Sequence, residues 1–176
     1  MAVTGRFVLL VALGVVPVVL AGLSGADAAW LALLGWLALS IGLGAIDLSL
    51  AATPRRVVLA RELPPRVRLG EAVVSTLTVT TTGERMLRAT VRDGWEPSAG
   101  VVGPNRARIS VPAGERRSLR QQLRPWRRGD RRSEHVSIRA AGPLGLWSRQ
   151  ASLVAPGVLR VLPPFHSRVH LPARLT

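Results

Sequence analysis

The residues of this chain that could carry chemistry are few, and they do not converge on one site. His166 and His170 have the i, i+4 spacing that places two imidazoles on one helix face, as a metal pair requires. Pro163 and Pro164 before them and Pro172 after them leave little room for a helix, and no carboxylate lies nearby in the sequence. The chain also has no cysteine, which excludes a disulfide framework, a thiolate nucleophile and a cysteine-ligated metal.

Other patterns with a chemical meaning are equally incomplete. Glu134 and His135 are adjacent in an expected strand, so their side chains should point to opposite faces. The glycines of 100–103 lack the lysine and the following helix of a phosphate-binding loop. No serine stands in a nucleophile-elbow context. We therefore predict no catalytic, cofactor-binding or metal site, no cofactor, no small-molecule substrate and no enzymatic activity.

Two long uncharged runs at the start of the chain dominate the sequence. They cover Phe7–Leu23 and Ala28–Ile46, and as helices they would be about 26 and 28 Å long, close to the roughly 30 Å of bilayer hydrocarbon. Neither run has the polar stripe of a soluble core helix. The sequence thus predicts a transmembrane helical hairpin over residues 1–52, joined by a tight polar turn.

A few residues inside the hairpin differ from the apolar background. Pro17 should kink the first helix. Ala38 and Gly42 have the small-xxx-small spacing that lets helices approach closely, although both residue types are common in membrane helices anyway. Asp47 lies near the inner end of the second run without a basic partner inside the bilayer, which favours an interfacial or helix-end role over a proton relay.

Charge predicts the orientation of the hairpin. The turn between the runs carries only Asp27, whereas arginines flank both outer ends: Arg6, Arg55, Arg56, Arg61, Arg66 and Arg68. Because such residues stay in the cytoplasm, we expect a multi-pass plasma-membrane protein with both termini inside. The alternative is a cleaved signal peptide, since residues 26–28 resemble a small-x-small cleavage site.

The overall charge fits the same placement. All 24 basic residues are arginines against 10 acids, a net charge of +14, and nearly all of this charge follows the hairpin. A basic domain near an anionic leaflet gains about 1 kcal/mol per residue at the surface. Nucleic acid is disfavoured because no dense basic run interleaves with aromatic residues.

Residues 53–164 read as an all-β domain. Short alternating runs are separated by turn residues, and the clearest of them, in 72–82, alternates Leu77 and Val79 with threonines. Turns are expected at 93–94, 129–130 and 156–157 among other places. The fold class predicted is a two-helix transmembrane hairpin followed by an antiparallel, immunoglobulin-like β-sandwich. The expected strands are Arg56–Ala60, Ala72–Thr82, Leu87–Gly94, Arg106–Val111, Arg116–Leu123, Ser133–Ala140, Trp147–Val154 and Val158–Leu162.

An ordered set of short motifs accompanies this architecture. It comprises Arg61-Glu62-Leu63-Pro64 with Gly70-Glu71, then Arg127-Arg128-Gly129, Gly142-Pro143-Leu144-Gly145-Leu146-Trp147 and Val161-Leu162-Pro163. With the hairpin, the set resembles the amino-terminal part of the membrane-anchored domain of unknown function 58 family. That resemblance implies a partnership with a MoxR-type AAA+ ATPase. The family's von Willebrand factor A-like half is absent, and residues 165–176 are expected to be a linker toward it.

The interaction candidates come from two of these motifs. Arg127 and Arg128 precede a predicted hairpin turn at Gly129. Leu144, Leu146 and Trp147 follow a Gly-Pro turn and could plug one end of the sandwich, and the alternative for Trp147 is an exposed anchor at a partner interface.

The function that these observations favour is a non-enzymatic, membrane-anchored scaffold. Its cytoplasmic sandwich would hold a MoxR-type ATPase or another membrane-complex protein against the lipid bilayer. One alternative is an extracytoplasmic module that binds envelope components. The second alternative is an arginine-rich nucleic-acid binder, whose DNA binding would fall steeply with salt.

Overall fold

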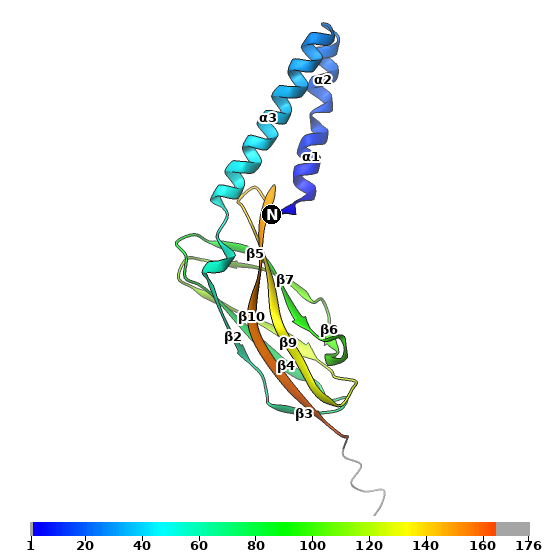
Figure 1. The fold of residues 1–176 in the computed structure, drawn as a ribbon, viewed down its shortest axis with the longest axis vertical. Coiled ribbons are helices and arrows are strands. Elements are labelled where there is room, and N and C mark those ends of the chain that lie inside the picture. The colour runs from blue at the N-terminus through cyan, green and yellow to red at the C-terminus, as the bar shows by residue number, and fades with distance from the viewer. Residues whose placement is uncertain (1, 165–176) are drawn as a thin grey trace, which may run out of the picture.

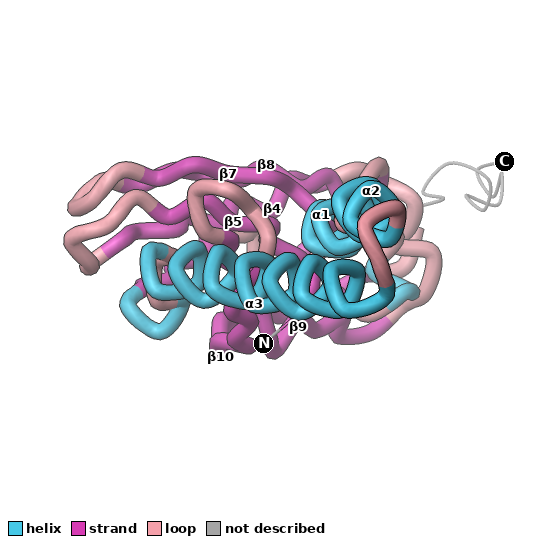
Figure 2. The backbone as a smooth tube through the Cα atoms, turned by 90° about the horizontal axis from the view of Figure 1, so that it is seen from above, coloured by secondary structure: helices cyan, strands magenta, loops and turns pink. Residues whose placement is uncertain are grey.

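The structure, a computed structural model, describes residues 2–164 and has two parts that lie end to end (Figure 1). A helical arm rises from one end of a β-sandwich, with α1 and α2 leading away from the strands and α3 returning to them. The helices are α1 (Gly5–Leu13), α2 (Val15–Gly22) and α3 (Ala26–Leu50). Figure 2 looks down on this arm and shows α3 beside α1 and α2, above the strands.

Both limbs of the arm are long and apolar enough to cross a membrane. The most apolar 18-residue windows have a mean hydropathy of 2.2 in Gly5–Gly22 and 2.0 within Ala26–Arg56. Only 6% and 11% of these apolar stretches is buried inside the protein. The arm therefore presents its apolar side chains to its surroundings, unlike a helix pair in the core of a soluble protein.

The first limb is broken at Gly14, between α1 and α2. Pro17 causes the break, because it has no N–H to donate to the carbonyl of Leu13 one turn earlier. This break lies one turn before Pro17, where the sequence predicts a kink.

The limbs touch at a different place from the one predicted. The Trp36 ring fills the space where a Cβ on Gly14 would lie, and Trp36 Nε1 donates to the Leu10 carbonyl at 3.0 Å. Ala38 and Gly42 are exposed, and nothing lies within 4 Å of the position of a Cβ on Gly42. The expected close approach at these two residues is wrong, because they face away from the other limb.

The sandwich is formed by two sheets. One has the strand order β1-β10-β9-β5-β7, with β3 paired in parallel to β10, and the other has the order β2-β4-β8-β6. The strands are β1 (Ala2–Val3), β2 (Val57–Glu62), β3 (Arg66–Arg68), β4 (Val73–Thr81), β5 (Leu87–Trp95), β6 (Val101–Val102), β7 (Arg106–Val111), β8 (Arg116–Leu123), β9 (Gly129–Ala141) and β10 (Trp147–Leu162). Short 3-10 helices cover Pro54–Arg56 and Pro97–Ala99.

Strict alternation along the strands builds the core. In β4 the odd-numbered residues from 73 to 81 are buried and the even-numbered ones are not. Leu77 and Val79 pack with Leu87, Val136 and Ile138, which belong to the opposite sheet. Each fully buried side chain of this kind stabilises the fold by about 1.5–3 kcal/mol. The predicted fold class, two apolar helices followed by an immunoglobulin-like sandwich, is confirmed.

Three expected turns, at 93–94, 129–130 and 156–157, are wrong, because all three positions lie within strands, and two of them mark bulges. Residues 93–94 lie inside β5, and residues 156–157 lie inside β10, which runs unbroken from Trp147 to Leu162. The registers of β10 and β5 with β9 shift at these points, between Val154 and Gly157 and between Asp93 and Trp95. A β-bulge lets a strand continue through proline and glycine, so the turn signals here mark bulges instead.

The bulge in β9 also overturns the expectation for Glu134 and His135. Both side chains are exposed, and His135 Nδ1 lies 4.0 Å from Glu134 Oε2. The strict two-residue alternation of a strand fails where one residue, Gly94, faces two residues of its neighbour.

Candidate functional site

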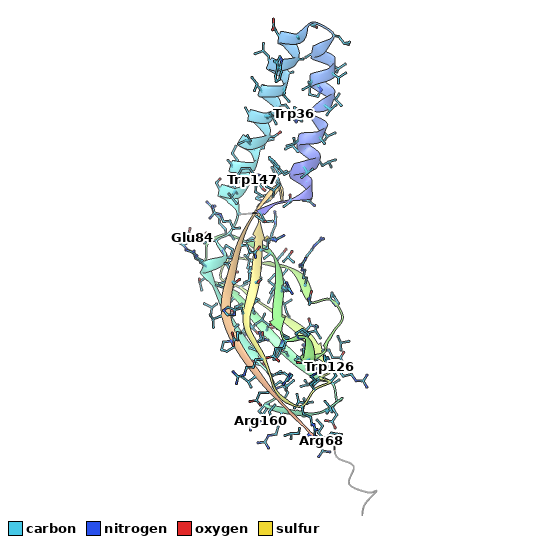
Figure 3. The ribbon with its side chains drawn as sticks, turned by 45° about the vertical axis from the view of Figure 1, so that its right-hand side comes forward. Trp36, Arg68, Glu84, Trp126, Trp147 and Arg160 are labelled. Atoms are coloured by element: carbon cyan, nitrogen blue, oxygen red, sulfur yellow. The ribbon has the colours of Figure 1, made fainter. Side chains whose placement is uncertain are left out.

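The five predicted interaction residues lie at opposite ends of the sandwich. Arg127 and Arg128 precede β9, whereas Leu144, Leu146 and Trp147 follow it. The 13 residues of β9 separate the two groups by about 40 Å. Figure 3 shows this separation, with Trp147 beside the helical arm and Trp126 at the far end. The structure therefore does not bring the two motifs together.

The loop between β9 and β10, residues 142–146, meets the end of α3 together with Trp147, the first residue of β10. Residues 142–147 are called the junction loop below. Asp47 of α3 has no solvent exposure. Its Oδ1 accepts the N–H of Leu144 at 2.7 Å, and its Oδ2 accepts the N–H groups of Leu146 and Trp147 at 2.7 and 3.2 Å. Hydrogen bonds to an ionised carboxylate are about twice as strong as neutral ones. Asp47 thus has the expected role at the end of a helix: its three hydrogen bonds lock the junction loop onto α3.

The N-terminal segment holds the same loop from the other side. Thr4 Oγ1 lies 2.6 Å from the Gly145 carbonyl and 2.7 Å from that of Leu146. The Arg6 guanidinium donates to the Leu144 carbonyl at 3.1 Å. The short strand β1 adds two residue pairs to the start of β10, including Val3 opposite Trp147. Both limbs of the arm are therefore tied to one loop.

Glycines let the junction close. A Cβ on Gly44 of α3 would lie 2.7 Å from the Trp147 ring, and a Cβ on Gly142 would overlap Asp47. The ring of Trp147 also packs against Phe7 of α1, with centroids 5.5 Å apart. Leu146 is buried while Leu144 is 52% exposed. The half-buried Trp147 thus contacts the arm, and Leu144 is the apolar side chain that the loop offers to solvent.

Several arginines lie near the end of the arm that joins the sandwich. The guanidinium of Arg85 donates to the Ser49 carbonyl, and that of Arg149 donates to Thr53 Oγ1 at 3.4 Å. Arg88 borders the same hollow as Leu50 and Pro143. We call this set the arginine collar: Arg6, Arg55, Arg56, Arg85, Arg88 and Arg149. Half of it comes from strands and turns beyond residue 80, so counting flanking residues in the sequence missed it.

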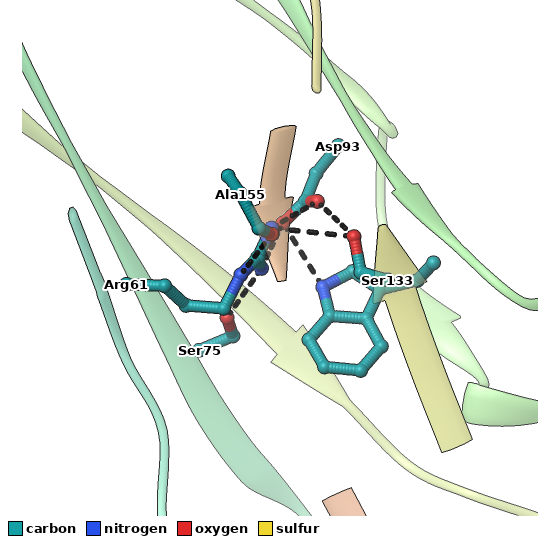
Figure 4. Close-up of polar contacts among 6 residues, drawn as sticks. Arg61, Ser75, Asp93, Ser133 and Ala155 are labelled. Atoms are coloured by element: carbon teal, nitrogen blue, oxygen red, sulfur yellow. Dashed lines mark hydrogen bonds and ion pairs between the residues drawn. The ribbon is translucent and has the colours of Figure 1, made fainter. Parts of the chain in front are cut away.

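A closed polar cluster lies between the two sheets (Figure 4). Arg61 of β2 and Asp93 of β5 form a paired ion bridge of 2.7 and 2.8 Å, with side chains 4% and 10% exposed. Ser133 Oγ and Trp95 Nε1 donate to the same carboxylate at 2.9 Å each, and Ser75 accepts from Arg61 at 3.1 Å. Every charged atom has a partner within the protein, so the cluster joins the sheets and leaves no open coordination for a ligand.

The far end of the sandwich carries the other motif. Arg127 stacks its guanidinium 4.8 Å from the centroid of the Trp126 ring, and Trp126 is 56% exposed. Gly129 has the expected positive φ, 98°, but it is the first residue of β9, and the preceding strand β8 belongs to the other sheet, so the predicted hairpin turn is wrong. Asp130 accepts a hydrogen bond from Arg160 Nε of the neighbouring strand β10 at 3.1 Å. Among residues 2–164 no group of three or more metal-ligating side chains occurs, and His166 and His170 lie outside the described residues, as does the expected linker 165–176.

Comparison with known proteins identifies no family and finds only distant structural similarity. No protein-family model and no curated protein matches the sequence. Among solved structures, an Escherichia coli alpha-2-macroglobulin is similar at 18% identity and TM-score 0.46, covering 61% of this chain and 7% of that one. The CARDB domain of a Pyrococcus furiosus protein, solved with di-metal ions, is similar at 14% identity and TM-score 0.46, covering 61% of this chain and 94% of that one. A Listeria innocua beta-glucosidase is similar at 14% identity and TM-score 0.41, over 62% of this chain and 16% of that one.

Proposed function

We propose that the protein is a non-enzymatic, membrane-anchored scaffold. Its helical arm spans the plasma membrane twice, and both termini face the cytoplasm. The sandwich is held in a fixed orientation at the inner leaflet. The observation that carries this proposal is the junction, where Asp47 binds the loop that begins the longest strand of the sandwich.

The surface of the arm supports the membrane placement. Leu9, Val16, Leu31 and Leu34 are each exposed by more than half, and they are part of an apolar surface along the whole length of both limbs. Contiguous apolar patches of this extent are rare on soluble monomers and are typical of membrane contact. The indole N–H of Trp36, near the middle of the arm, donates to the Leu10 carbonyl of the other limb, as the hydrocarbon region requires.

The arginine collar supports the orientation. Its arginines lie near the end of the arm that joins the sandwich, whereas the turn at the opposite end of the arm carries Asp27 and no basic residue. Basic residues at membrane ends favour the cytoplasmic side. Each would add about 1 kcal/mol of attraction to anionic headgroups.

The junction supports the role of a scaffold over that of a flexible tether. The described chain passes from α3 into β2 through a short 3-10 helix, and Ala51 and Ala52 in this connection are buried. With the locked junction loop, both connections between arm and sandwich are short and hydrogen-bonded. A partner bound to the sandwich would be held at a defined height and rotation. The resemblance described above makes a MoxR-type AAA+ ATPase the partner that we propose.

Cysteine labelling tests the topology directly, because the chain has no cysteine of its own. Ser24→Cys places a thiol in the exposed turn between the limbs, and Ser152→Cys places one on an exposed position of β10. In intact cells an impermeant maleimide should label the first variant and should reach the second only after permeabilisation. The reverse pattern would instead establish the envelope-facing module.

A second experiment tests the partner. The full chain in nanodiscs is immobilised and titrated with a purified MoxR-type ATPase from the same genome. Saturable binding that a soluble, unrelated AAA+ ATPase does not reproduce supports the partnership, and equal retention of both ATPases rejects it.

A further inference from the structure

The outer face of β5, β7 and β9 carries a groove lined by polar and positively charged side chains. Its volume is about 410 Å³. Three neighbouring strands and β10 supply its lining, which contains no carboxylate and no aromatic ring: Thr90, Arg92, Arg106, Arg108, Ser137, Arg139 and Gln150. We call this the arginine groove.

Strand register gathers the arginines in the groove. Arg92 of β5 is directly opposite Arg106 of β7, while Thr90 lies between Arg108 on one side and Arg139 on the other. Like charges directly opposite each other on a sheet face are destabilising. The fold thus holds four guanidinium groups together on one rigid surface against their mutual repulsion.

The chain supplies no counter-charge inside the groove. The Arg139 side chain donates to Gln150 Oε1 at 3.1 Å. The side chains of Arg92, Arg106 and Arg108 make no hydrogen bond or ion pair with any residue of 2–164. Glu96 and Glu134 do not line the groove; they line an adjacent hollow that Arg92 also borders. Elsewhere the sandwich does pair its arginines, as in the bridges of Asp93 and Asp130. The uncompensated charge is therefore a property of this face.

We propose that the arginine groove binds an acidic, extended segment of a partner protein. Guanidinium groups bind carboxylates in pairs of parallel hydrogen bonds. Arg106 and Arg108 lie two residues apart on one face of β7, about 7 Å apart, which is also the spacing of alternate side chains in an extended chain. Moreover, β7 is the last strand of its sheet, so the neighbouring space is open to a partner.

Other anionic ligands fit the groove less well. Single-stranded nucleic acid is bound on aromatic platforms, and no aromatic side chain lines the groove. Lipid headgroups would meet the arginine collar at Arg88, whereas Arg92 lies four residues further along β5, about 13 Å beyond it. The groove thus faces the space beside the membrane, where a partner of the scaffold would stand.

This inference deepens the proposed scaffold role and rests on it only for the kind of partner. The test uses the full chain in detergent micelles at about 0.15 M salt, so that its outcome does not depend on topology. The probe is a short fluorescent peptide of alternating glutamate and threonine. A peptide of the same composition with its glutamates in one block, and an oligonucleotide of equal charge, are the comparison ligands.

Three variants separate geometry from charge. Arg106→Ser with Arg108→Ser removes two charges from the groove, Arg106→Lys with Arg108→Lys keeps the charge without the planar fork, and Arg116→Ser with Arg117→Ser removes two exposed charges from β8 of the other sheet. We expect the serine pair in the groove to weaken binding of the alternating peptide at least about tenfold, the lysine pair to weaken it less, and the β8 pair to leave it near the unmodified value.

The binding measurements either support the inference or overturn it. Preference for the alternating peptide together with this order of variants supports the inference. Equal loss in the groove and β8 variants, tighter binding of the oligonucleotide, or no binding of the peptide overturns it. The cysteine-labelling pattern is unaffected by these outcomes, so failure of the groove and failure of the membrane topology are told apart.

Discussion

The carboxylate of Asp47 accepts the backbone N–H of Leu146 at 2.7 Å, although 99 residues separate them in the sequence. The contact is buried, and it joins the last turns of an apolar helix to the loop between two long strands. A membrane arm and a sandwich connected only by a peptide linker would need no such bond. The position of the acid near the end of the apolar helix therefore has a structural explanation.

Replacing Asp47 by asparagine should loosen the junction. Asparagine offers one acceptor oxygen, and its NH₂ group would face backbone N–H donors, so at least one of the three amides loses its partner. We expect a loss of about 1–3 kcal/mol in stability. The measurement is thermal unfolding of the full chain in detergent, together with faster hydrogen exchange at residues 144–147.

Asp27→Asn is the matched control, because Asp27 is an exposed acid at the other end of α3. It should leave the unfolding temperature and the exchange of the junction loop unchanged. Equal behaviour of the two variants would mean that Asp47 does not hold the loop.

Two glycines of α3 should respond oppositely to alanine. Alanine is favoured over glycine in helices by about 1 kcal/mol. Gly42 has open space at its Cβ position, so Gly42→Ala should be neutral or stabilising. Gly44→Ala forces a methyl group to 2.7 Å from the Trp147 ring, and we expect it to be destabilising by about 1–3 kcal/mol. The measurement is the unfolding temperature of each of the two variants. A Gly44→Ala variant more stable than the unmodified chain would show that the Trp147 ring and α3 are not in contact.

The ion bridge between the sheets predicts a strong asymmetry between single and double replacement. Arg61→Ala leaves the carboxylate of Asp93 buried without its charge partner, and a broken buried pair of this kind costs about 3–5 kcal/mol. Replacing both residues, as Arg61→Met with Asp93→Leu, should be much less destabilising.

Urea unfolding of the full chain measures this effect, with Arg66→Ala as a control at an exposed position of β3. A single Arg61→Ala variant as stable as the control would remove the structural role that we assign to the cluster.

The sequence predicts well what depends on local periodicity. The alternation of Leu77 and Val79 with threonines identifies β4 because one face of that strand is packed against the opposite sheet. Pro17 likewise places the kink through its own missing donor. The turn predictions fail where the same residue types are also compatible with a β-bulge. Asp93-Gly94 and Pro156-Gly157 resemble turns in the sequence, but β5 and β10 continue through them as strands because both pair with β9, with a register shift at each point.

The candidate site is harder to predict because its parts are distant in the sequence. Asp47, Arg61 and Asp93 could each be noted as unusual, but no local rule tells which amides or charges they meet. Helix spacing predicts close packing at Gly42, but it does not reveal that the junction loop docks at Gly44. The collar is incomplete in the sequence for the same reason, since Arg85, Arg88 and Arg149 reach the arm only through the fold.

A distance measurement across the junction tests the central claim most directly. Spin labels on Ser24→Cys and Ser110→Cys report on the tip of the arm and on the exposed face of β7, and pulsed electron paramagnetic resonance in nanodiscs gives the distribution of distances between them. A locked junction predicts one narrow distribution, which broadens when Asp47→Asn is added. A broad distribution in the otherwise unmodified chain, or a narrow one that Asp47→Asn leaves unchanged, would contradict the lock.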